Sequence, residues 1–140
     1  MAYSLNDLYG GLRSVMRVNG LVVGVGAGLL LLLFPRGVMD VAGLSTGEAV
    51  WPYRLIGSLL LALGAMLLIS AQERVVSTAS MVAMIIANAL MAIVLLVGYM
   101  QGEFGGLGLF GQMGLVLIFL ICLISAIVPV RYLRTDYVVL

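Results

Sequence analysis

The sequence predicts an all-α polytopic membrane protein, with four transmembrane helices in a bundle and an amphipathic interfacial helix at the N-terminus. The chain has 140 residues, of which 64% are hydrophobic and only 9% are charged. A soluble domain is about half apolar and about a quarter charged, so this composition excludes a water-soluble globule. Four apolar segments each approach the roughly 20 residues that a helix needs to cross a bilayer. The length allows one membrane domain, residues 1–140, and no second domain of ordinary size.

The four apolar segments give the expected transmembrane helices at residues 18–34, 52–71, 77–99 and 107–130. Short polar breaks separate them. The first apolar run is the shortest and could be taken for a signal peptide. No small-x-small cleavage site follows Phe34, so we expect this segment to remain as a membrane span.

Residues 5–16 have the pattern of an amphipathic helix. Apolar side chains recur there at the spacing of one helical face, at Leu5, Leu8, Tyr9, Leu12, Val15 and Met16. Polar side chains occupy the other face. We therefore expect an interfacial helix that lies on the cytoplasmic surface of the membrane. A helix docked on a partner protein is the alternative that this pattern leaves open.

The arginines predict the orientation. Four spans place both termini and the second loop on one side of the membrane, and that side carries Arg13, Arg17, Arg74, Arg131 and Arg134. The other side carries only Arg36 and Arg54. Because short cytoplasmic loops are enriched in Lys and Arg, both termini are expected in the cytoplasm, in a multi-pass protein of the cell (inner) membrane.

Small residues recur every four positions in two of the spans and are candidate helix-packing residues: Gly20, Gly24 and Gly28 in the first span, and Ala79, Ala83 and Ala87 in the third. In lipid there is little hydrophobic drive between helices, so close van der Waals contact along such a stripe has to hold them together. The alternative is a gap that accommodates a lipid or pigment tail.

Met81, Met84, Asn88 and Met91 share one face of the third span, and Asn88 is the most central strongly polar residue of the chain. One interpretation is a packing seam in which the Asn88 amide bonds to another helix. The other is a surface that faces a lipid or a quinone. A quinone site normally also has an ionisable proton partner, and none is near in the sequence, so packing is favoured.

Several kinds of site are excluded by the residues that are missing. The chain has no His and a single cysteine, Cys122, which excludes disulfides, zinc sites and histidine-ligated haem. Seven Arg, no Lys and six acids cannot neutralise a nucleic-acid backbone. Gly106, Gly108 and Gly111 match the dinucleotide fingerprint, but they lie between membrane helices rather than between a strand and a helix, so no nucleotide is expected. We expect no catalytic, cofactor-binding or metal-binding residues.

The run Trp-Pro-Tyr-Arg-Leu-Ile-Gly at residues 51–57, followed by Ser-Leu-Leu-Leu-Ala-Leu-Gly at 58–64, resembles the second span of DoxX-like four-helix bacterial membrane proteins. The resemblance covers this one segment in sequence and the rest of the chain in its layout. It implies a four-helix bundle, often a subunit of a bacterial electron-transfer assembly. The chain departs from the family in having no cysteine pair and no acid at membrane depth, which argues against a redox activity of its own.

These observations predict a non-catalytic accessory subunit of a larger membrane complex, in a respiratory or photosynthetic electron-transfer assembly. The expected partners are other membrane subunits and membrane lipids, with no cofactor. A small four-helix transporter is one alternative, although such exporters depend on a carboxylate in the first span and this chain has only glycines and aliphatic residues there. A lipid-binding or quinone-binding membrane protein is the other alternative.

Overall fold

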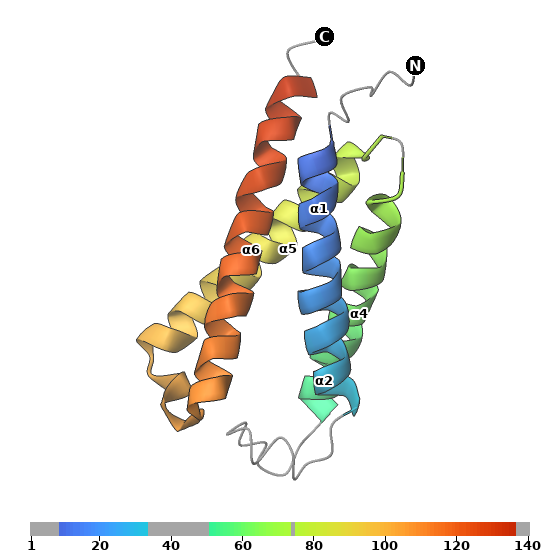
Figure 1. The fold of residues 1–140 in the computed structure, drawn as a ribbon. Coiled ribbons are helices and arrows are strands. Elements are labelled where there is room, and N and C mark those ends of the chain that lie inside the picture. The colour runs from blue at the N-terminus through green and yellow to red at the C-terminus, as the bar shows by residue number, and fades with distance from the viewer. Residues whose placement is uncertain (1–8, 34–50, 74, 137–140) are drawn as a thin grey trace.

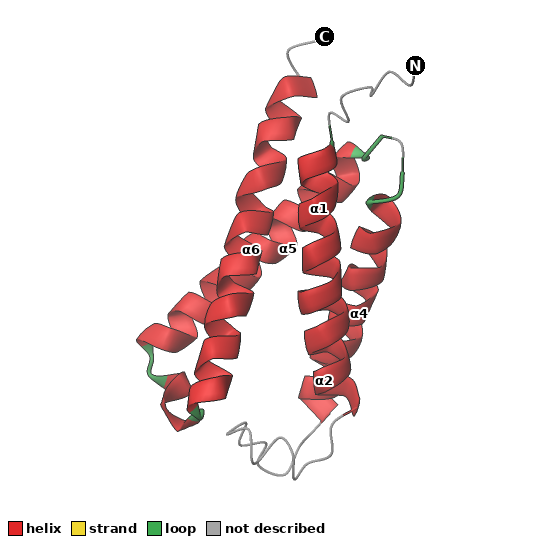
Figure 2. Cartoon of the chain, viewed as in Figure 1, coloured by secondary structure: helices red, strands yellow, loops and turns green. Residues whose placement is uncertain are grey.

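The fold is a bundle of long helices, seen in a computed structural model that describes residues 9–33, 51–73 and 75–136 (Figure 1). No strand occurs within these described residues (Figure 2). The helical elements in chain order are α1 (Gly10–Asn19), η1 (Gly20–Ala27), α2 (Gly28–Leu33), α4 (Trp51–Ser70), α5 (Thr78–Met100), η2 (Glu103–Gly106) and α6 (Leu109–Asp136).

Four helices in the described part of the chain are long and apolar enough to cross a membrane: Gly10–Leu33, Trp51–Ser70, Thr78–Met100 and Leu109–Leu133. Backbone N–H and C=O groups have no water to bond with in the hydrocarbon core, so a helix, which pairs them internally, is the natural way for such segments to span it. The prediction of an all-α, multi-pass bundle of four transmembrane helices is therefore confirmed.

The N-terminal segment differs from the interfacial helix expected at residues 5–16. Residues 10–16 are the first turns of one helix that runs from Gly10 to Leu33 through α1, η1 and α2. Leu12 and Met16 are fully buried against other helices of the chain. The predicted apolar face is present, but it packs into the bundle. The helical spacing of its apolar side chains continues without interruption into the membrane span. Residues 5–8 lie outside the described residues.

The middle of this first helix, η1, has the wider π-helical form over eight residues. Such segments are rare and occur mostly as single-turn bulges in α-helices. Here η1 contains Gly20 and Gly24, whose lack of side chains leaves room for the backbone of a neighbouring helix. Its axis continues that of α1 and α2, so the three segments form one rod (Figure 1).

The helices associate as two close pairs. The first helix packs along α4, and α5 packs along α6, while contact between the pairs is concentrated where α1 meets α6, with smaller contacts between α4 and α5 and between η1 and α6. The start of α1, the end of α6 and the turn between α4 and α5 lie at one end of the bundle (Figure 1). At that end the Arg13 guanidinium donates to the carbonyl of Glu73 at 2.7 Å, and the rings of Tyr9 and Tyr132 stack 5.9 Å apart.

The core consists of two apolar clusters at different heights. The first lies near the end that holds the start of α1 and contains Leu12, Met16, Leu67, Ala71, Val76, Met81 and Met84. The second contains Val23, Leu60, Ala92 and Cys122. Each of the four long helices contributes to both clusters, either through these buried residues or through partly buried side chains that pack on them. Between the two clusters lies a small group of buried polar residues.

Candidate functional site

The buried polar group consists of Asn19 from α1, Asn88 from α5 and Ser125 from α6. All three side chains are 1% exposed or less. The Asn19 Nδ2 group donates to Asn88 Oδ1 at 2.6 Å and to Ser125 Oγ at 2.8 Å. One amide thus joins three helices that are far apart in the sequence. We call Asn19, Asn88 and Ser125 the polar layer.

A further bond fixes which way the two amides face. Asn88 Nδ2 donates to the carbonyl of Met84 at 2.8 Å, one turn earlier in its own helix. Asn88 must therefore present its oxygen to Asn19, and Asn19 must present its nitrogen in return. This assignment leaves Asn19 Oδ1 buried with no hydrogen-bond donor among the described residues. An unpaired buried acceptor of this kind costs about 1–3 kcal/mol.

The glycines of the first span lie against α4. A Cβ atom added to Gly24 would overlap the Cα atom of Gly64, and one added to Gly28 would lie 3.0 Å from the carbonyl oxygen of Gly57. Gly20 faces Gly64 and Leu68 in the same way. Backbone therefore meets backbone at Gly24 and Gly64, and leucine side chains of α4 pack beside Gly20 and Gly28.

The alanines of the third span are placed differently. Ala79 is exposed, and Ala83 and Ala87 are only partly buried. The glycines of the first helix and α4 make close backbone contacts inside the described bundle. The alanine stripe is exposed or only partly buried on α5.

The methionine face of α5 lies inside the bundle. Met81 and Met84 are fully buried in the first apolar cluster, and Asn88 is buried in the polar layer. Met91 is partly buried beside Cys122, whose Sγ lies 3.5 Å from the Met91 Sδ. Met81, Met84 and Asn88 are therefore buried among the helices of the described bundle, because their spacing directs them toward the first helix and α6.

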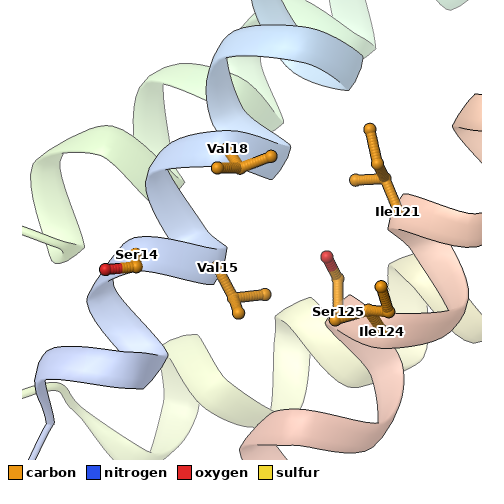
Figure 3. A pocket seen from close by; sticks show the side chains of 6 residues that line it. All are labelled: Ser14, Val15, Val18, Ile121, Ile124 and Ser125. Atoms are coloured by element: carbon orange, nitrogen blue, oxygen red, sulfur yellow. The ribbon is translucent and has the colours of Figure 1, made fainter.

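An open groove lies next to the polar layer, between α1 and α6 (Figure 3). Its volume is about 180 Å³, and its lining residues are Ser14, Val15, Val18, Ile121, Ile124 and Ser125. Ser125 Oγ is directed into the space between the two helices, whereas Ser14 Oγ is turned away from it (Figure 3). Ser14 instead donates to the carbonyl of Gly10 at 3.1 Å. Ser125 is thus the one side chain that belongs to both the groove and the polar layer.

No metal site is present among the described residues, since no three His, Cys, Asp or Glu side chains gather there. Cys122 is a free thiol buried in the second apolar cluster. The glycines at 106, 108 and 111 lie at the end of η2 and the start of α6, between two helices.

Asn19 and Ser125 are not among the residues that the sequence pattern singles out. The first span is predicted to begin at Val18, which places Asn19 at its edge. The spacing of Leu12, Met16, Asn19 and Val23 indicates that Asn19 shares a helical face with these apolar residues. Steps of four, three and four residues keep all of them on that face. Ser125 likewise lies three residues after Cys122 on the inner face of α6. Neither signal shows by itself that the three polar groups meet.

Helix lengths, composition and burial define this chain as a multi-pass, four-helix membrane protein with an internal polar layer. Comparison with known protein families, with curated proteins and with solved structures finds no match.

Proposed function

We propose that the chain is a non-catalytic accessory subunit of a larger membrane complex, seated in the inner cell membrane with both termini in the cytoplasm. One observation carries the proposal: the alanine stripe of α5 is only partly covered inside the described bundle. Small side chains on a helix in lipid permit close approach of another helix, and they make poor contacts with lipid tails. Ala79, Ala83 and Ala87 keep such a surface at least partly open.

A second stripe of the same kind runs along α4, where Ser58, Ala62 and Ala65 are all exposed. Their spacing of four and three residues puts them on one face. The glycine-bearing face of α4 is already occupied by the first helix. The outer surfaces of α4 and α5 therefore both offer small residues to helices that do not belong to this chain.

Two sequence features favour an electron-transfer assembly and an orientation with both termini in the cytoplasm. The resemblance of residues 51–64 to DoxX-like proteins favours a respiratory or photosynthetic electron-transfer complex. Arg13, Arg17 and Arg131 lie toward the end of the bundle that holds the start of α1 and the end of α6, which favours that end as the cytoplasmic one. The subunit would seal and stabilise the complex, and lipid would cover the remaining apolar surface.

The test is the composition of the native particle. Purified from its own membranes in a mild detergent, the chain is expected to migrate with partner subunits, far above its own 14.8 kDa plus the micelle. Ala79→Leu and Ala62→Leu, each on an exposed small-residue position, are expected to release it from the particle while its helical circular dichroism is kept. The control is Ile86→Leu on the exposed surface of α5, which changes shape but not volume.

Two results would contradict the proposal. A wild-type chain that purifies as a monomer or homodimer and moves a substrate across liposomes would make it a small transporter. Retention of the partners by both alanine variants would show that the small-residue faces are covered by lipid alone.

A further inference from the structure

The groove between α1 and α6 offers hydrocarbon contact and opens outward. Its walls are the side chains of Val15, Val18, Ile121 and Ile124 (Figure 3). Val18 and Ile124 are each about half exposed, so the groove faces the surface that lipid covers in a chain with membrane-spanning helices. None of the described residues that line it is charged. An alkyl chain therefore fits this groove, whereas an ionised group within it would lose its hydration without compensation.

The groove is closed at the end of the bundle that holds the start of α1. A Cβ atom added to Gly11 would lie 2.9 Å from the hydroxyl of Tyr132, and the rings of Tyr9 and Tyr132 stack there. Gly11 precedes Val15 by about one helical turn. Because α1 and α6 touch at this point, an alkyl chain in the groove reaches this end of the bundle along the outer side of α6.

Arg131 lies where such a chain would emerge. Ile121, Ile124, Val128 and Arg131 follow one another at steps of three, four and three residues, so they share one face of α6. Arg131 is exposed, and it lies about 10 Å beyond Ile124 along the helix. The headgroup layer of a bilayer is about 5–7 Å thick on each side. With Arg131 among the headgroups, Ile124 is therefore level with the outer part of the hydrocarbon.

The charge at this end selects the headgroup. Among the side chains described there, Arg13, Arg17 and Arg131 outnumber the one acid, Glu73. Arg13 donates to the carbonyl of Glu73 in the turn after α4. Arg17 is on the α4 side of the first helix, since Gly20, three residues later, faces α4. Arg131 is thus the described arginine aligned with the groove, and a guanidinium binds a phosphate through paired N–H groups.

We propose that the groove between α1 and α6 holds one acyl chain of an anionic phospholipid, and that Arg131 binds the phosphate of the same lipid. The bound lipid touches one helix from each of the two helix pairs, because α1 belongs to the first pair and α6 to the second. It therefore stabilises the contact between the pairs from the outside of the bundle.

The test measures binding to the full chain in detergent micelles, by native mass spectrometry and by equilibrium titration. The probes are a phosphatidylglycerol and a phosphatidylcholine with the same acyl chains, and glycerol phosphate, which keeps the anion but has no chain. Phosphatidylglycerol is expected to bind about fivefold more tightly than phosphatidylcholine, the factor that one basic residue gives beside an anionic headgroup. Glycerol phosphate is expected to show no measurable binding, because it makes no contact with the groove.

Two variants separate the phosphate contact from the chain contact. Arg131→Gln is expected to abolish the preference for phosphatidylglycerol and to leave phosphatidylcholine binding unchanged. Ile124→Trp fills the groove and is expected to weaken both lipids about tenfold, as the loss of roughly two buried methylene groups would. The matched controls are Arg54→Gln, an exposed arginine at the start of α4, and Ile127→Trp, which is 52% exposed against 51% for Ile124 and does not line the groove. Both controls are expected to bind as the wild type does.

Four results would overturn the proposal. Equal binding of the two phospholipids by the wild type would remove the anionic preference, and glycerol phosphate that binds as tightly as phosphatidylglycerol would remove the role of the chain. An Arg17→Gln variant that loses the preference as fully as Arg131→Gln would assign it to the overall charge of this end. Equal weakening by Ile127→Trp and Ile124→Trp would mean that lipid covers α6 without a site. The substituted side chains are all exposed, and circular dichroism checks that the helices are kept. Since the isolated chain is measured, this proposal and the accessory-subunit proposal can fail separately.

Discussion

Asn19 donates both of its amide hydrogens to groups on other helices, Asn88 Oδ1 and Ser125 Oγ. Hydrogen bonds between transmembrane helices contribute about 0.6 kcal/mol on average and about 1.7 kcal/mol at most. They are modest because the separated helices in lipid also find partners for their polar groups. The polar layer therefore sets which helix faces meet, while the apolar clusters above and below it supply most of the packing.

A double-mutant cycle tests this assignment. Asn88→Leu is expected to destabilise the fold by about 1 kcal/mol, because Asn19 loses one acceptor and keeps Ser125. Asn19→Leu together with Asn88→Leu should cost less than the sum of the single changes, with a coupling free energy of about 0.6 kcal/mol. Reversible unfolding in mixed micelles measures these values. A cycle between Asn88→Leu and Ser58→Ala serves as the control and should show no coupling, since Ser58 lies on α4 and bonds only to its own helix.

At the scale of the helix, the first helix and α4 touch through their backbones. Gly24→Ala is expected to destabilise the bundle by about 1–3 kcal/mol, because the new methyl group would overlap the Cα atom of Gly64 and neither backbone can move alone. Gly64→Ala should act in the same way, since its added Cβ would lie 2.8 Å from the Cα atom of Gly24. Unfolding in mixed micelles again measures the loss.

The matched control for these variants is Gly114→Ala in α6. Nothing lies within 4 Å of the position that its Cβ would take, so this change should be neutral or slightly stabilising. Equal losses at Gly24 and Gly114 would contradict the close contact between the first helix and α4.

The continuity of the first helix makes a separate prediction. Leu12→Ala is expected to cost about 2 kcal/mol or more, because Leu12 is fully buried among side chains of α4 and α5 and its removal leaves a cavity. Leu21→Ala, at a position of the same helix that is 56% exposed, should cost far less. Thermal unfolding of the detergent-solubilised protein distinguishes them. If residues 10–16 instead lay on the membrane surface, Leu12→Ala would leave the unfolding transition unchanged.

For the whole molecule, the arrangement of helix ends predicts a labelling pattern. The turn after α4 and the start of α1 lie at one end of the bundle, and η2 lies at the other (Figure 1). In a Cys122→Ala background, Gly105→Cys should react with an impermeant maleimide in intact cells. Gln72→Cys should react only after the membrane is permeabilised. Both positions are exposed, so accessibility within the protein does not decide the outcome.

The reverse pattern would place both termini outside the cytoplasm and would contradict the orientation inferred from the arginines. Labelling of both positions in intact cells would mean that α5 does not cross the membrane.

Fold class and helix number could be predicted from the sequence because both depend on properties that are local to each segment. A run of about 20 apolar residues is enough to span the hydrocarbon core, whatever it packs against. The spacing of Gly20, Gly24 and Gly28 similarly shows a face without side chains, although it does not show that Gly57 and Gly64 lie opposite. The amphipathic pattern of residues 5–16 was also local, and it could not distinguish an apolar face buried in lipid from one buried in the bundle.

The partners of each face were decided only by the tertiary structure. Asn88 and Ser125 lie 69 and 106 residues after Asn19 along the chain, and only Asn88 is singled out by the sequence pattern. Their meeting depends on the tilt, rotation and height of three helices at once, which no single segment encodes. The unpaired oxygen of Asn19 and the groove beside Ser125 follow from that same packing. That four helices can cross a membrane is therefore a property of the sequence of each segment. Where their polar groups meet is a property of the three-dimensional packing, because hydrogen bonds and close backbone contacts depend on distances between segments that are remote along the chain.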